Sequence, residues 1–166
     1  MIAIKTVALF AWLRMILDLS SEPGPESSLK SGGLLVKIVN IFYPGLGATY
    51  DNYRDMASLE NCEKVLRKLA HAFEYAVLAL LIWLLIYEII NIADVGSAEL
   101  KYKFLIKSMV LSEIFVICVG SIDEINQTRL AERYGTPVDV LVDAVGGFIM
   151  LAIVYLLQRR RKAGTD

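Results

Sequence analysis

Long apolar stretches alternate with short polar ones along most of this chain. Four stretches are apolar enough, and close enough to the roughly 20 helical residues that cross a bilayer of about 30 Å, to span a membrane. The pattern predicts an all-α membrane protein, a single domain of 166 residues built as a bundle of four transmembrane helices. The expected spans are about residues 2–19, 69–92, 104–120 and 137–157.

The first stretch is the least apolar, because it contains Lys5, Arg14 and Asp18. Arg14 and Asp18 are four residues apart, so they share one helical face and partly neutralise each other. A cleaved signal peptide is the rival interpretation of this stretch. No small-x-small cleavage site follows it, which favours a retained span.

The segment between the first two spans, residues 20–68, has a different character. It opens with "SSEPGPESS", whose prolines and glycine predict a loop. Its middle, "LLVKIVNIFYPGLG", is apolar but too short and too interrupted to span. An interfacial or re-entrant helix that ends at Pro44 and Gly45 is expected there. The fourth span begins at Pro137, which suits the first turn of a helix because its missing N–H costs nothing.

Composition agrees with a membrane protein: 56% of residues are hydrophobic, 21% are charged and the mean hydropathy is +0.53. A net charge of −1 gives no indication of a nucleic-acid partner. Phosphate-binding glycine loops, nucleophile elbows and zinc-protease signatures are missing from the sequence. Cys62 and Cys118 form no metal or redox spacing. The sequence therefore disfavours a soluble enzyme.

Basic residues near the span ends predict the orientation in the membrane. The C-terminal cluster Arg159, Arg160, Arg161 and Lys162 favours a cytoplasmic C-terminus, and Lys101 and Lys103 between the second and third spans agree. An even number of spans then places both termini in the cytoplasm. Three residues oppose this orientation, since it leaves them outside: Lys64, Arg67 and Lys68.

Unusual polar residues gather at one membrane face, because consecutive spans alternate in direction. The start of the second span, the end of the third and the start of the fourth share that face, together with the loop residues Arg129 and Arg133. A single polar pocket there would satisfy charges that are costly at such depth. The predicted ligand-binding residues are His71, Glu74, Tyr75, Asp123, Glu124, Gln127, Arg133, Asp139 and Asp143.

Helical spacing supports this grouping. His71 and Glu74 are three residues apart and Asp139 and Asp143 are four apart, so each pair shares one face. Gly146 and Gly147 follow on nearly the same stripe, where another helix can approach closely. The competing explanation for each residue is a solvated helix end or an interaction with the helix dipole. Glu113 lies in the middle of a predicted span with no obvious partner. Its position fits either a functional role or a hydrogen bond to another helix.

Two blocks of the sequence, "RKLAHAFEYAVLALL" and "SIDEINQTRLAERYGTPVDVLVDAVGG", resemble those of the VanZ-like family of membrane proteins. The first span with "LDLSSEPGPES" resembles the usual opening of that family. The resemblance covers most of the chain except about residues 30–60 and falls on the residues of the predicted pocket and Gly146. The family often carries a histidine just before the glutamine, where this chain has Asn126, which counts against a two-histidine metal site.

The family takes its name from a protein associated with resistance to teicoplanin, a lipoglycopeptide. The resemblance implies a small bacterial cytoplasmic (inner) membrane protein with its site toward the outer face. The first functional hypothesis is recognition of an envelope amphiphile: a membrane lipid, a lipid-linked precursor or a lipoglycopeptide, with an arginine on its phosphate or carboxylate.

The second hypothesis is an intramembrane hydrolase or transferase acting on such a lipid, with Glu74 or Asp143 as general base and His71 as proton shuttle or metal ligand. No cofactor is expected, although one histidine with several carboxylates can hold a divalent cation. The third hypothesis is a structural or assembly protein in which the polar cluster only holds helices together. The sequence does not predict the oligomeric state.

Overall fold

The described part of the chain consists of helices joined by turns and short loops. The computed structural model describes residues 1–49, 51–52, 57–92, 97–130 and 133–163. Strands are absent from these ranges. The five α-helices and one 3₁₀ helix, η1, are α1 (Ile2–Ser20), α2 (Gly24–Phe42), η1 (Pro44–Leu46), α3 (Ala57–Ile92), α4 (Ala98–Gln127) and α5 (Pro137–Ala163).

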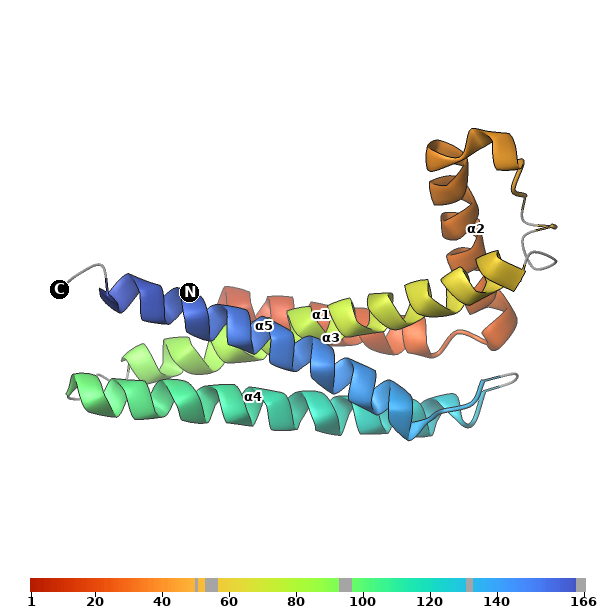
Figure 1. Cartoon of the computed structure of the whole chain (residues 1–166). Coiled ribbons are helices and arrows are strands. Elements are labelled where there is room, and N and C mark those ends of the chain that lie inside the picture. The colour runs from red at the N-terminus through yellow and green to blue at the C-terminus, as the bar shows by residue number, and fades with distance from the viewer. Residues whose placement is uncertain (50, 53–56, 93–96, 131–132, 164–166) are drawn as a thin grey trace.

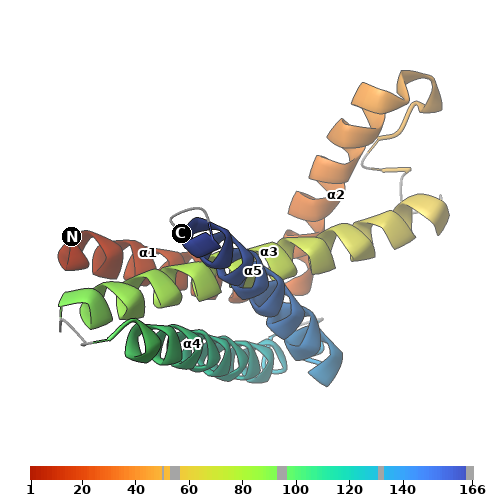
Figure 2. The same ribbon diagram turned by 60° about the vertical axis from the view of Figure 1, so that its left-hand side comes forward.

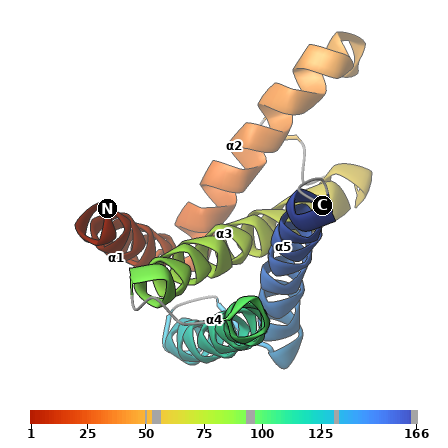
Figure 3. The ribbon, with the colours of Figure 1, turned by 90° about the vertical axis from the view of Figure 1, so that its left-hand side faces the viewer.

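Four of the helices form a bundle, and α2 stands apart from it. In Figure 1, α1, α3, α4 and α5 run along a common direction, while α2 projects crosswise at one end. The N-terminus and the C-terminal end of α5 lie toward the opposite end of the bundle from α2. Turning the molecule shows the same projection of α2 (Figures 2 and 3). Within the bundle, α5 has its most extensive contact with α3.

Within the described ranges, three helices are long and apolar enough to cross a membrane, which indicates a multi-pass membrane protein. The spans are Leu59–Ile92, Tyr102–Gln127 and Pro137–Arg160. They correspond to the second, third and fourth predicted spans. Helix α1 packs beside α3 but is not among the three. Its three charged residues set it apart in composition, so three of the four predicted spans are confirmed.

The charges of α1 have partners. Lys5 Nζ lies 2.5 Å from Glu88 Oε2 of α3 and also donates to the main-chain oxygen of Leu84 at 3.3 Å. Arg14 Nε and Asp18 Oδ2 are 3.0 Å apart, which confirms that these residues share one face of the helix. The Lys5–Glu88 pair ties α1 to α3 near the ends of the two helices that lie away from α2.

The connector contains more helix than the sequence pattern predicts. The predicted loop "SSEPGPESS" is wrong beyond Pro23, because α2 begins at Gly24 with Pro25 in its first turn, where a proline costs no hydrogen bond. Helix α2 ends at Phe42, just before Pro44, as expected from the chain geometry at proline. Helix α3 begins at Ala57. Residues 57–68, expected in the connector, are therefore part of the same helix as the second span.

The bundle core lies where α3, α4 and α5 meet, and Ile16 of α1 packs against it. Tyr75, Leu78 and Ala79 are fully buried on α3, and Val116 is fully buried on α4. Trp83 and Tyr87 stack with their ring centroids 5.0 Å apart. Cys62 and Cys118 are free cysteines. The side chains of Lys101, Arg161 and Lys162, which contribute to the predicted orientation, lie outside the described part.

Candidate functional site

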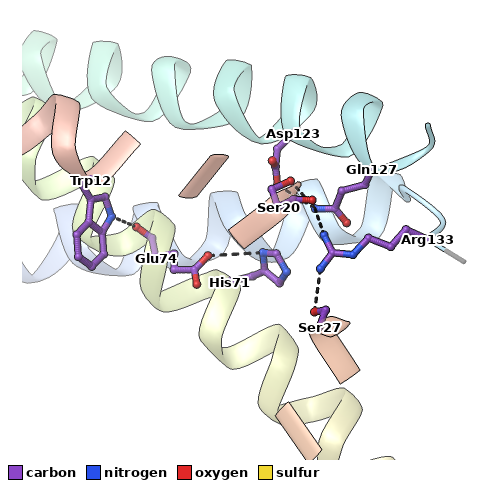
Figure 4. A network of polar contacts seen from close by, with 8 residues as sticks. All are labelled: Trp12, Ser20, Ser27, His71, Glu74, Asp123, Gln127 and Arg133. Atoms are coloured by element: carbon purple, nitrogen blue, oxygen red, sulfur yellow. Dashed lines mark hydrogen bonds and ion pairs between the residues drawn. The ribbon is translucent and has the colours of Figure 1, made fainter. Parts of the chain in front are cut away.

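A hydrogen-bonded network around Arg133 joins α1, α2 and α4 (Figure 4). Arg133 follows α4, and its Nη1 donates to the main-chain oxygen of Ser20 at 2.7 Å. Its Nη2 donates to Ser27 Oγ on α2 at 2.9 Å. Gln127 Nε2 donates to Asp123 Oδ2 at 2.9 Å and to Ser20 Oγ at 3.4 Å. The ends of three helices are thus held together by one guanidinium and one amide.

The turn between α4 and α5 is fixed by a second set of polar contacts. Thr136 donates its main-chain N–H to Glu124 Oε2 at 2.8 Å and its hydroxyl to Asp139 Oδ2 at 2.8 Å. Lys68 Nζ of α3 lies 2.5 Å from Asp139 Oδ1. Glu124 and Asp139 therefore already have partners, which leaves them less free than the sequence predicts to hold a ligand.

His71 and Glu74 lie on the same face of α3, as their spacing predicts. His71 Nδ1 is 3.9 Å from Glu74 Oε2, so the imidazole and the carboxyl group are close without forming a hydrogen bond. The main-chain oxygen of Glu74 accepts a hydrogen bond from Trp12 Nε1 at 2.9 Å, which docks α1 against this part of α3. Figure 4 shows both contacts.

Tyr75, Asp123 and Asp143 are buried in the interior of the bundle. Their exposed fractions are 0%, 1% and 0%. The Tyr75 hydroxyl, Asp123 Oδ1 and both carboxyl oxygens of Asp143 make no hydrogen bond within the described part of the protein. Gly120 gives Asp143 room, because a Cβ there would lie 3.2 Å from Asp143 Oδ2. Asp143 is therefore buried, while Asp139 lies nearer the surface beside Lys68.

Two neighbouring cavities open beside these residues. The first has a volume of about 310 Å³ and lies between the end of α1, α2 and α3. The second has a volume of about 260 Å³ and lies beside the α4–α5 turn. Three residues line both cavities: Arg67, His71 and Arg133. The remaining lining residues of the first cavity are Leu19, Glu22, Ser27, Lys30, Ser31, Leu34, Leu66, Ala70 and Glu74.

The first cavity is lined by three basic residues, Lys30, Arg67 and Arg133, and by two acidic ones, Glu22 and Glu74. Burial lowers the pKa of Arg133, and the nearby positive charge of Arg67 lowers it further. An arginine nonetheless stays protonated in proteins. Arg67 is half-buried and makes no hydrogen bond or ion pair within the described ranges. The acidic residue Glu22 pairs with Lys30 at the rim of this cavity.

Several site residues were not found from the sequence. Arg67 and Lys68 enter the sequence analysis only as orientation signals, and Lys30 not at all. Arg129, named with Arg133 as a candidate, is exposed and lines neither cavity. Gly146 and Gly147 adjoin Ala72 and Glu113 respectively. Among the described side chains, no group of three His, Cys, Asp or Glu residues could hold a metal ion.

No protein-family model, curated protein or solved structure matches this chain. The resemblance to the VanZ-like family therefore stays a prediction that depends on the two sequence blocks.

Proposed function

We propose that this protein recognises the anionic head group of an envelope amphiphile in the cavity between α1, α2 and α3. One observation carries the proposal. Arg67 and Arg133 line the same cavity, of about 310 Å³, as the apolar side chains Leu19, Leu34 and Leu66. An amphiphile with a phosphate or carboxylate head group and an acyl chain would complement this lining, because its negative charge matches the arginines and its chain matches the leucines.

The two arginines differ in a way that suits anion binding. Arg133 is held in place by its bonds to Ser20 and Ser27. Arg67 has no partner among the described residues, so its guanidinium is free to form charge-assisted hydrogen bonds with a ligand. An anion between the two guanidiniums would also relieve the repulsion that lowers the pKa of Arg133.

The position of the cavity suits an amphiphile. It lies where α2 leaves the bundle, at the end of the spans. We infer that α1 is a fourth span, since 19 residues extend about 28 Å along a helix and its charges are paired. With a cytoplasmic C-terminus, four spans place both termini inside and the cavity at the outer face of a bacterial cytoplasmic membrane.

His71 and Glu74 line the cavity and would orient the polar part of the ligand. Asp123 and Asp143 do not line this cavity: Asp123 accepts a hydrogen bond from Gln127, and Asp143 lies beside Gly120 of α4. The ligand chemistry fits a phospholipid, a lipid-linked phosphate or a lipoglycopeptide such as teicoplanin. The last of these is suggested by the family resemblance alone.

Lipid retention in native mass spectrometry tests the proposal. The purified protein is offered phosphatidic acid and phosphatidylcholine with identical acyl chains. Wild type is expected to retain phosphatidic acid preferentially, and Arg67→Gln to weaken that retention by roughly tenfold, the effect of one charge-assisted hydrogen bond. Arg129→Gln is the matched control, because it removes an exposed arginine that lines neither cavity. Equal retention of both lipids by wild type would refute the proposal.

A second candidate is an intramembrane hydrolase or transferase for the same class of lipid. It is favoured by His71 and Glu74, which face the cavity with their Nδ1 and Oε2 atoms 3.9 Å apart. A substrate that enters the cavity could bring this pair into proton-transfer contact. Turnover of bound lipid by wild type, abolished in Glu74→Gln with binding retained, would establish it. Binding without turnover supports recognition alone.

A further inference from the structure

A separate cavity lies between α4 and α5, away from the Arg67–Arg133 site. Its volume is about 520 Å³, within the range of roughly 300–1,000 Å³ typical of small-molecule sites. Val110 and Ile114 of α4 and Phe148 of α5 are about half exposed or more, so the cavity opens sideways toward the lipid. Its other lining residues are Ile106, Met109, Glu113, Leu151, Ala152 and Tyr155.

Glu113 is the one charged residue that lines this cavity in the described part of the chain. Its Oε2 atom is buried and has no hydrogen-bond partner there. The side chain lies over Gly147, where an added Cβ would come within 2.8 Å of Oε2. Lys107 is six residues away, roughly 9 Å along the helix, and lies over the Phe104 ring instead. Among the described residues, Glu113 thus has neither a counter-ion nor a hydrogen-bond donor, although it lies in the middle of a span.

Lipid acyl chains do not meet this need, because they carry no hydrogen-bond donor and no charge. A carboxyl group at this depth is stable when it pairs with a cation or accepts hydrogen bonds. An amine attached to an apolar body supplies both a positive charge and an N–H donor. The aromatic rings of Phe148 and Tyr155 in the wall add a favourable surface for a cation.

We propose that the α4–α5 cavity binds a membrane-soluble amine, with the ammonium on Glu113 and the apolar body against Phe148, Leu151 and Val110. This site is independent of the proposed head-group site, which lies on α1, α2 and α3 and selects anions. The two sites would therefore take ligands of opposite charge.

Saturable binding of tritiated imipramine, a tricyclic amine, to the protein in nanodiscs tests this site, with empty nanodiscs subtracted. Glu113→Gln keeps the size of the side chain and is expected to raise the Kd at least tenfold. Ala152→Phe fills the cavity from α5 and is expected to act in the same direction. Glu88→Gln is the matched control: it removes a carboxylate from another membrane helix, one that is paired with Lys5, and should leave the Kd unchanged.

Competition separates the role of the amine from that of the ring system. Iminodibenzyl has the rings of imipramine without the alkylamine, and it should compete at least tenfold less well. Wild type without saturable binding would overturn the proposal. So would equal competition by iminodibenzyl, or an unchanged Kd in both Glu113→Gln and Ala152→Phe. Size-exclusion profiles identify any variant that fails to fold. If Glu113→Gln or Ala152→Phe fails to fold, the Kd of the other variant tests the proposal.

Discussion

Gly146 of α5 lies directly against the main-chain carbonyl of Ala72 in α3: a Cβ on Gly146 would fall 2.1 Å from that oxygen. A contact this close is available only to glycine. Gly146→Ala must therefore separate the two helices that have the most extensive contact in the bundle. We expect it to lower the free energy of unfolding by at least about 2 kcal/mol, as overpacked cores do. Unfolding in detergent titrated with sodium dodecyl sulfate measures this.

Gly33→Ala is the control for that change. Gly33 lies within α2, and a Cβ there would have no neighbour within 4 Å. Replacing a helical glycine by alanine is expected to leave stability unchanged or to raise it by up to about 1 kcal/mol. Similar losses in the two variants would mean that α3 and α5 do not pack as described.

The Lys5–Glu88 pair predicts non-additive effects on stability. Both side chains are about one fifth exposed, at 21% and 20%. Lys5→Met or Glu88→Gln alone leaves one unpaired charge, and we expect a loss of about 2 kcal/mol, below the roughly 3–5 kcal/mol seen for fully buried pairs. The double variant should recover most of that loss. Additive losses in the double-mutant cycle would show that α1 is not docked on α3 by this pair.

Asp143 distinguishes a functional from a purely structural polar cluster. Both its carboxyl oxygens are buried without a partner in the described part of the protein. Asparagine keeps the size of the side chain and removes only a buried carboxyl group that no described residue binds, so Asp143→Asn is expected to raise or preserve the unfolding free energy. If Asp143 instead holds helices together, Asp143→Asn should lower the unfolding free energy. A loss above about 1 kcal/mol, the typical worth of a hydrogen bond, would favour Asp143 as a tie between helices.

Helix α2 is expected to lie in the membrane interface, because it projects crosswise from the spans and exposes 73% of Phe42. A spin label at position 42 should show a shallow depth by electron paramagnetic resonance with oxygen and a nickel chelate. A label at Phe115, on the exposed mid-section of α4, should be deep. Cys62 and Cys118 are first replaced by alanine. Equal depth at both positions would make the segment re-entrant instead.

The helices were largely predictable from the sequence because a bilayer forces every backbone group to be satisfied within the segment. Apolar runs therefore located α3, α4 and α5 correctly. Their ends were not predictable in the same way, because charged residues interrupt the apolar runs near the ends of the helices. Helix α3 begins at Ala57 and α4 continues to Gln127, both beyond the predicted spans.

Individual contacts of the site were predictable only where both partners share a helix. Spacing correctly placed His71 with Glu74 on one face, and Asp123 and Gln127, four residues apart on α4, are joined by a 2.9 Å hydrogen bond. Contacts between helices leave no such periodicity. Arg133 binds the Ser20 carbonyl across 113 residues of sequence, and no pattern in the chain indicates that pairing. Arg67 was missed because a basic residue near a span end also fits an orientation signal.

Photo-crosslinking from Leu34 tests the central claim most directly. Leu34 lines the Arg67–Arg133 cavity and is 51% exposed. A benzophenone amino acid at this position, in protein reconstituted with equal amounts of phosphatidic acid and phosphatidylcholine, should crosslink mainly to phosphatidic acid. Adding Arg67→Gln should abolish that preference, while Arg129→Gln should leave it intact. Crosslinks in proportion to bulk lipid, unchanged by Arg67→Gln, would contradict an anion-selective head-group site between α1, α2 and α3.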